Sequence, residues 1–310
     1  MERRQFIRQT AGLTLLSALP EIPFSLLANE EDVKLILLHT NDTHSRIEPF
    51  PDDGRKYGGM GGIARRATLV KQIRKEYRNV LLLDSGDILQ GTPYFNFFKG
   101  EVEFTMMSEM GYDASTLGNH EFDNGAELLS DQLKFANFPF IISNYDFKDS
   151  PLNGKVIPNK IFEFSGIRIG VFGLGIKLEG LVLKRLYGNI IYNDPVKAAR
   201  EQVELLKKKH KCDLIICLSH LGYSYHNDMV DDKKVATSVS DIDIILGGHT
   251  HTFLTKPDEV LSPNLKKTLI SQTGFGGIYV GKIEIVFSKR TGQKSFQSSL
   301  MPLEKNFVKI

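Results

Sequence analysis

VLLLDSGD, residues 80–87, is a four-residue apolar run that ends abruptly in two carboxylates separated by serine and glycine. A continuous apolar run of this length, bounded by turn residues, is typical of a β-strand. Between such runs the sequence carries amphipathic stretches, as in residues 61–77, where apolar side chains recur at helical spacing. This alternation of strand and helix patterns predicts an α/β fold.

The same sequence pattern, an apolar run followed directly by polar residues that can bind a metal, recurs in four other segments. They are LILLHTND (35–42), DASTLGN (113–119), DLIICLSH (213–220) and IDIILGGHTH (242–251). In α/β folds, strand ends and the loops after them converge on one edge, where ligands bind. The candidate ligands at the five strand ends are Asp42, His44, Asp87, Asn119, His220, His249 and His251.

These seven side chains form a donor set suited to a two-metal hydrolase. Four are imidazoles and the others supply oxygen, a mixture that suits Zn, Mn or Fe better than Ca or Mg. Asp42 and His44 are two residues apart, so an extended backbone would point both to one side. His249 and His251 either share a side in the same way or reach different ions if the chain turns at Thr250. A lone histidine after a strand is more often an ordinary polar group, but five such strand ends favour one shared site.

His120 and Asp123 form a second candidate group beside these ligands. Asp123 can hold the His120 imidazole in one tautomer and orientation, and it can also cap the next helix. A histidine held next to two cations can stabilise charge on a phosphoryl group or protonate a leaving alkoxide. No nucleophile elbow is present in the sequence, which favours direct attack by a metal-bridging hydroxide over a covalent intermediate.

Further predicted elements surround these motifs. Strands are expected at 33–38, 80–83, 114–117, 138–143, 214–218 and 242–246, a hairpin at 161–172 turning at Ser165-Gly166, and helices at 61–77, 102–110, 125–136 and 195–208. The last fifth of the chain has no helix pattern, and its strands at 268–272, 278–287 and 295–301 are expected to form a meander. A purely parallel sheet is therefore not expected. Residues 29–310 are predicted to be one catalytic domain.

Composition is that of an ordinary globular protein. The 310 residues are 41% hydrophobic and 25% charged, with a net charge of +2 that argues against a nucleic-acid partner. Cys212 and Cys217 are predicted to be buried apolar residues and not a disulfide or metal pair. The glycine-rich stretch 58–62 lacks the Lys-Ser/Thr ending of a P-loop and is interpreted as structural.

Residues 1–28 are expected to be an export signal of the twin-arginine (Tat) type. Arg3-Arg4 precedes a moderately apolar stretch, which is the order of regions in such signals. Pro20 and Pro23 interrupt that stretch, so a stable membrane span is not expected. The expected location of the mature protein is the periplasm or the cell surface.

Six sequence blocks together resemble a known enzyme family. LLHTNDTHSRIEP, GGIAR, VLLLDSGDILQGT, DASTLGNHEFDNG, LSHLG and GGHTHTFL, in this order, resemble the catalytic domain of the 5′-nucleotidases, which are calcineurin-like metallophosphoesterases. The resemblance spans residues 33–303 and implies a four-layer α/β/β/α sandwich with two mixed sheets. It also implies one metal on Asp42, His44, Asp87 and His251, a second on Asp87, Asn119, His220 and His249, and His120 with Asp123 as the catalytic pair.

The sequence departs from the family pattern in two ways. His251 stands where well-known 5′-nucleotidases have Gln or Asn, which leaves the metal preference open. Family enzymes usually carry a C-terminal domain that binds the nucleoside, and the sequence ends at Ile310, so this domain is expected to be absent. Either a separate nucleoside-binding chain supplies that half of the site, or the enzyme accepts other phosphate esters.

The expected function is hydrolysis of phosphomonoesters, with nucleoside 5′-monophosphates as the preferred substrates, at two divalent metal ions. A 2′,3′-cyclic phosphodiesterase, a nucleotide-sugar hydrolase and a thiosulfohydrolase-type sulfur-ester hydrolase are alternatives with the same centre. A metal-binding protein without turnover, or a subunit active only with its partner chain, are alternatives from another class. The presence of both His120 and Asp123 disfavours an inactive protein.

Overall fold

The computed structural model describes residues 32–306, so the predicted export signal at 1–28 lies outside the described residues. The first half contains β1 (Val33–Thr40), α2 (Ile63–Glu76), β2 (Val80–Asp84), α3 (Pro93–Phe98), α4 (Glu101–Met110), β3 (Ala114–Ser115), η2 (His120–Phe122), α5 (Ala126–Gln132), η3 (Leu133–Phe135), β4 (Phe140–Ile141), β5 (Tyr145–Asp146) and β6 (Val156–Ile157). The second half contains β7 (Asn159–Phe164), β8 (Ile167–Leu174), α6 (Lys184–Tyr187), β9 (Ile191–Tyr192), α7 (Pro195–Glu204), the π-helical turn η4 (Leu205–Lys209), β10 (Leu214–Ser219), α8 (Asp232–Ser238), β11 (Ile244–Leu246), β12 (Asp258–Leu261), β13 (Lys267–Ser271), β14 (Tyr279–Phe287) and β15 (Lys294–Pro302). Every helix within residues 32–306 is too short or too polar to cross a lipid bilayer.

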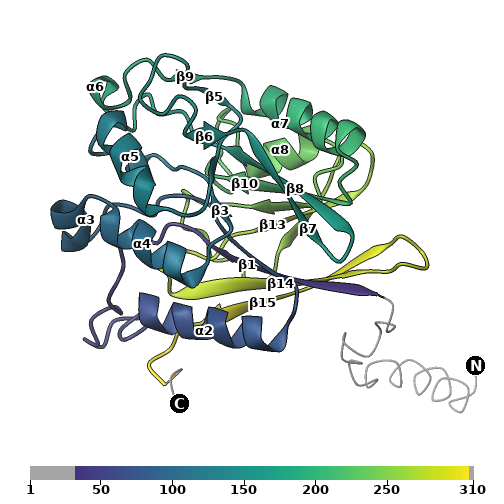
Figure 1. Ribbon diagram of the computed structural model, residues 1–310, viewed down its shortest axis with the longest axis horizontal. Coiled ribbons are helices and arrows are strands. Elements are labelled where there is room, and N and C mark those ends of the chain that lie inside the picture. The colour runs from purple at the N-terminus through teal and green to yellow at the C-terminus, as the bar shows by residue number, and fades with distance from the viewer. Residues whose placement is uncertain (1–31, 307–310) are drawn as a thin grey trace, which may run out of the picture.

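Two mixed sheets form the centre of the molecule (Figure 1). A seven-stranded sheet has the order β15-β14-β1-β2-β3-β4-β6, and a six-stranded sheet has the order β12-β13-β11-β10-β8-β7. In the first sheet β1 is parallel to β2 and antiparallel to β14. In the second sheet β10 is parallel to both β8 and β11, while β7 and β12 are antiparallel edge strands.

Three apolar cores separate four layers of structure. Helices α2 to α5 pack on the outer face of the seven-stranded sheet, the two sheets pack on each other, and α7 and α8 pack on the outer face of the six-stranded sheet. The predicted α/β/β/α sandwich is therefore confirmed (Figure 1).

The strand β1 shows why its sequence is apolar at consecutive positions. Leu35 and Leu37 lie in the core between the sheets, whereas Ile36 and Leu38 lie in the core under the helices. Successive strand side chains point to opposite faces, and both faces of this strand are covered. The strand therefore has apolar residues at consecutive positions, and not apolar and polar residues in alternation.

Several local predictions are confirmed. Ser165-Gly166 joins β7 to β8 in an antiparallel hairpin. Pro195 is the first residue of α7, and the Asp194 carboxylate accepts hydrogen bonds from the backbone N–H groups of the first turn. Cys212 and Cys217 are buried and unpaired.

The predicted meander at the end of the chain is confirmed for its last two strands, since β14 and β15 pair antiparallel, but it is wrong for its first strand, β13. The strand β13 belongs to the six-stranded sheet, where it is parallel to β11, whereas β14 and β15 belong to the seven-stranded sheet. The connection between β13 and β14 contains Gly274, Gly276 and Gly277, all with positive φ, and it carries the chain from one sheet to the other. Proximity in sequence suggested pairing, but Leu269 of β13 and Ile283 of β14 face the same core between the sheets from opposite sides, so these two strands do not pair.

The strands that precede the candidate ligands come from both sheets. β1, β2 and β3 of the seven-stranded sheet end just before residues 42–44, 87 and 119, and β10 and β11 of the six-stranded sheet end just before residues 220 and 249–251. The candidate site therefore collects residues that follow strands of both sheets.

Candidate metal centre

The loops that leave these strands turn sharply at the ligand residues themselves. Asp42, His44, Asp87, His249 and His251 have φ values of 51°, 50°, 54°, 68° and 52°, all in the left-handed region. The expectation of extended backbone at residues 42–44 is therefore wrong. Left-handed conformations are costly for residues with a Cβ atom, and such strain concentrates at functional sites.

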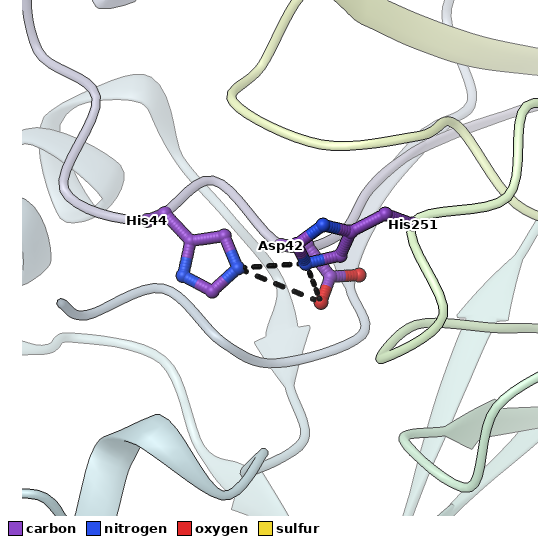
Figure 2. A group of neighbouring side chains, drawn as sticks. All are labelled: Asp42, His44 and His251. Carbon is purple, nitrogen blue, oxygen red and sulfur yellow. Dashed lines mark hydrogen bonds and ion pairs between the residues drawn. The ribbon is translucent and has the colours of Figure 1, made fainter. Parts of the chain in front are cut away.

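Asp42, His44 and His251 form the first group of ligand atoms, shown in Figure 2. His44 Nε2 lies 2.9 Å from His251 Nε2, and Asp42 Oδ1 lies 3.3 Å from His251 Nε2 and 3.9 Å from His44 Nε2. Two imidazole nitrogens at this distance cannot both carry protons. The two nitrogens and the carboxylate oxygen lie close enough together to be ligands of one divalent cation.

Asp87, His220 and His249 form the other side of the site. His220 Nε2 lies 3.0 Å from Asp87 Oδ2, and His249 Nδ1 lies 2.9 Å from Asn119 Oδ1. Asp87 is also within 4.8 Å of ligand atoms of His44, so its carboxylate lies between the two groups. His249 and His251 point into different groups, which is the second of the two arrangements considered for this pair.

The charges at this site are strongly coupled. Burial would lower the pKa of His220, but the adjacent Asp87 carboxylate offsets this and raises the pKa to about 10. Burial would raise the pKa of Asp87, and His220 instead holds it below its usual range. Burial and the nearby His220 lower the pKa of His249 to about 4. A divalent cation bound here would take the place of the proton on His220.

Backbone carbonyl groups orient two of the imidazoles. His220 Nδ1 lies 2.6 Å from the Ser85 carbonyl oxygen, and His44 Nδ1 lies 3.3 Å from that of Leu89. Because a carbonyl only accepts, each Nδ1 carries a proton and donates, which leaves Nε2 as the nitrogen that faces the site and would bind a metal ion. His220 Nε2 is fully buried and makes no aligned hydrogen bond within residues 32–306. Such hydrogen bonding of the far ring nitrogen is typical of metal-binding histidines, so the residues present fit two divalent cations.

His120 and Asp123 lie beside these groups. His120 Nδ1 is 2.7 Å from Asp123 Oδ2, and the His120 ring is 5.3 Å from the His44 ring. Burial would lower the pKa of His120, but the hydrogen bond to Asp123 raises it above its usual value. Asp123 does not cap α5, because the N-cap residue is Gly125 and no side chain caps that helix.

Glu121 is a buried residue to which the sequence pattern assigned no role. Its carboxylate accepts hydrogen bonds from the backbone N–H groups of Asp87, Ile88 and Leu89 at 3.0, 2.7 and 3.1 Å, and of Gly118 at 2.5 Å. One side chain thereby holds the loop after β2 against the loop after β3. The only sequence signal was its place inside the GNHEFDNG block.

Close packing at the centre also requires glycine. A Cβ atom on Gly118 would overlap the Asp87 carboxylate, and one on Gly86 would lie 2.6 Å from the Gly118 nitrogen. No side chain fits at either position without moving the loops that carry the ligands.

The Glu121→Gln variant is expected to bind divalent metal about 10- to 100-fold more weakly, the usual cost of losing a residue that orients the ligands from behind. In the wild-type protein both carboxylate oxygens of Glu121 accept hydrogen bonds from backbone N–H groups. In the variant an amide NH₂ group replaces one of these oxygens and cannot accept from a backbone N–H group. Competition with a chelator measures the affinity, and Glu127→Gln on the exposed face of α5 is the matched control. Unchanged metal affinity in Glu121→Gln, or an equal loss in the control, would contradict this role.

Residues 35–253, the span that carries this site, match the family model described as calcineurin-like phosphoesterase. This chain belongs to the calcineurin-like phosphoesterase family. Membership confirms the predicted fold and the predicted class of enzyme, a metal-dependent phosphoric ester hydrolase.

This calcineurin-like phosphoesterase is also similar to known 5′-nucleotidases. It is 36% identical over 277 residues to snake venom 5′-nucleotidase from Crotalus adamanteus, covering 83% of the chain and 46% of that relative. It is 36% identical over 301 residues to the human 5′-nucleotidase, covering 90% and 50%. The crystal structure of a 5′-nucleotidase precursor from Thermus thermophilus superposes with a TM-score of 0.77 at 32% identity, covering 89% and 57%. The chain thus spans about half the length of the curated relatives it matches.

Proposed function

We propose that this chain hydrolyses phosphate monoesters at a dinuclear metal centre, with nucleoside 5′-monophosphates as its substrates. The observation that carries the proposal is the position of the Asp87 carboxylate between two groups of ligand atoms from both sheets. The similarity to 5′-nucleotidases supports a nucleotide as the substrate.

The two groups of residues would hold one cation each. Asp42, His44 and His251 would hold the first, His220, His249 and Asn119 the second, and Asp87 would be shared. When bound, two divalent cations lower the pKa of a water molecule between them and stabilise negative charge on a phosphoryl group.

His120 would act on the substrate directly. Because its Nδ1 is bound to Asp123, Nε2 is the ring nitrogen that remains to donate a hydrogen bond to a phosphoryl oxygen. The same nitrogen would give a proton to the leaving alkoxide. The side chains of His120 and His251 are 32% and 41% exposed, whereas those of Asp42 and His220 are fully buried, so substrate would approach on the side of His120 and His251.

The test is a substrate panel on the isolated chain loaded with Mn²⁺ or Zn²⁺. AMP, a 2′,3′-cyclic nucleotide, a UDP-sugar, an aryl phosphate and an organic thiosulfonate separate the alternatives that share this centre. AMP is expected to give the highest kcat/KM, and a chelator is expected to abolish turnover. Preference for another member of the panel would replace the nucleotidase assignment. Activity that appears only with a co-purifying polypeptide would favour a subunit completed by a nucleoside-binding partner.

We also propose that the chain is exported by the twin-arginine route. The support is the Arg3-Arg4 pair and the apolar stretch after it, which lie outside the described residues. Replacing both arginines by lysine is expected to retain the full-length protein in the cytoplasm, as measured by fractionation. Unchanged export of the double variant would contradict this route.

A further inference from the structure

Asp84, the first carboxylate of the motif VLLLDSGD, is fully buried and is not one of the candidate metal ligands. Its Oδ2 atom accepts a hydrogen bond from the Thr40 hydroxyl at 2.6 Å, and its Oδ1 atom accepts from the Gly86 N–H group at 2.9 Å and the Ser115 hydroxyl at 3.0 Å. Thr40, Asp84 and Ser115 are the last residues of β1, β2 and β3, and they lie next to one another in the parallel register. One carboxylate therefore joins the ends of the three strands of this sheet that lead into the candidate site.

The turn formed by residues 84–87 touches both groups of ligand atoms through its backbone. The Ser85 carbonyl oxygen accepts from His220 Nδ1 at 2.6 Å, and the Gly86 carbonyl oxygen accepts from the Asp42 N–H group at 2.9 Å. The last residue of the turn carries the carboxylate that lies between the two groups. The hydrogen bond from the Gly86 N–H group to the carboxylate two residues before it closes this turn, as in an Asx-turn. That bond therefore sets the direction of both carbonyl groups.

Behind Asp84 the hydrogen bonds continue away from the metal centre. Because the Thr40 hydroxyl gives its only proton to Asp84, it accepts from the Tyr112 hydroxyl, 2.8 Å away. The Tyr112 oxygen in turn accepts from the Arg66 guanidinium on α2 at 3.4 Å. All four side chains are at most 3% exposed. They form a buried chain in which every donor points toward the Asp84 carboxylate.

The surroundings of Asp84 favour its charged form at neutral pH. Burial raises the pKa of Asp84 to about 6, and the hydrogen bonds that it accepts oppose a larger rise. The ionised side chain has acceptor sites for all of its donors. A buried charge is costly unless it is hydrogen-bonded, so removal of one donor is expected to disturb the carboxylate and the turn that depends on it.

We propose that Asp84 is a positioning residue for both metal ions, which it orients through the turn of residues 84–87, while Thr40 and Tyr112 hold it from the side of the helices. This inference rests on the proposed function, because it describes how the dinuclear centre is held. Within residues 32–306 Asp84 belongs to none of the groups of ligand atoms, so its effect on a metal ion passes through the backbone of the turn. A change at Asp84 is therefore expected to weaken metal binding without removing a ligand.

Calorimetric titration of the metal-free full chain with Mn²⁺ tests this role without any need for turnover. Asp84→Asn and Thr40→Val are each expected to lower the affinity for Mn²⁺ by about 10- to 100-fold, the usual effect of losing a residue that supports metal ligands from behind. Thr40→Ser keeps the hydroxyl that donates to Asp84, and it is expected to bind Mn²⁺ as tightly as the wild type.

Thr268→Val is the matched control for the lost hydroxyl. Thr268 is also fully buried, and its hydroxyl donates to the Ile242 carbonyl oxygen at 2.8 Å. Thr40→Val and Thr268→Val are both expected to lower the melting temperature of the metal-free protein, since each loses a buried hydrogen bond. Only Thr40→Val is expected to lose affinity for Mn²⁺, which separates a positioning role from a purely structural one.

Wild-type affinity in Asp84→Asn or in Thr40→Val, or an equal loss of affinity in Thr268→Val or Thr40→Ser, would overturn the role of Asp84. If Asp84→Asn does not fold, the comparison of Thr40→Val with Thr40→Ser decides the inference. If the wild-type chain binds two Mn²⁺ ions but releases phosphate from no nucleotide, the proposed function fails, and the same titrations still decide the role of Asp84. A wild-type chain that binds no Mn²⁺ would overturn both.

Discussion

His120→Asn is expected to lower kcat for phosphate release by about 10²- to 10⁴-fold, the usual contribution of a general acid. The variant is expected to keep about two metal ions per chain, the number held in such two-metal sites. His120 Nδ1 is already bound to Asp123, so the lost function is that of the nitrogen facing the substrate. Steady-state kinetics with AMP and elemental analysis of the same preparation measure the two quantities together.

Metal content decides whether His120 acts on the substrate or binds a metal. His120 is close enough to His44 and Asp87 for its ring nitrogen to belong to one group of ligand atoms. Loss of one metal ion in His120→Asn would therefore make it a ligand and overturn the assigned role. His226→Asn, in an exposed loop, is the control for a histidine lost without effect on kcat or metal content.

Asp87→Asn is expected to have the largest effect on the metal centre. Loss of the shared carboxylate is expected to reduce the metal content to one ion or fewer per chain. The effect on kcat is expected to be on the order of 10³-fold or more, because two-metal charge stabilisation contributes several kcal/mol and each 1.36 kcal/mol is tenfold in rate. Asparagine retains the shape of the side chain but leaves the buried His220 without its charged partner.

Elemental analysis, kinetics and thermal unfolding measured on metal-free and metal-loaded protein test this variant. The metal-free variant is also expected to be less stable by about 3–5 kcal/mol, the cost of breaking a buried ion pair. Asp149→Asn is the control, since Asp149 is an exposed carboxylate far along the chain from any candidate ligand. Retention of two metal ions and wild-type activity by Asp87→Asn would rule out a shared carboxylate.

Much of the architecture could be predicted because its causes are local in sequence. The apolar runs at 33–38, 80–83 and 214–218 predicted strands, and β1, β2 and β10 lie at these positions. Pro195 and Ser165-Gly166 act through their own backbone preferences, so the helix start and the hairpin were predicted where they occur.

The sheet membership of β13 and β14 could not be predicted in this way. Both strands are apolar and adjacent in sequence, yet β13 pairs with β11 and β14 pairs with β1. The sheet that each strand joins depends on its pairing partner, and both partners, β1 and β11, come earlier in the chain. The residues of β13 and β14 themselves do not indicate which partner each strand has. The same limit applies to Glu121, whose four backbone partners lie on two different loops.

The sequence by itself determined the donor chemistry of this protein and the strand ends at which the donors stand, because residue type and apolar periodicity are properties of each segment alone. Residue spacing left the grouping of these donors open, the family resemblance implied one, and only the tertiary structure shows which ligand atoms lie together. His249 and His251 are two residues apart but belong to different groups, whereas His44 and His251 are 207 residues apart and their nitrogens lie 2.9 Å from each other. Left-handed turns at the ligand residues and the packing of one sheet on the other produce that grouping. These depend on contacts between distant segments, which sequence spacing does not contain.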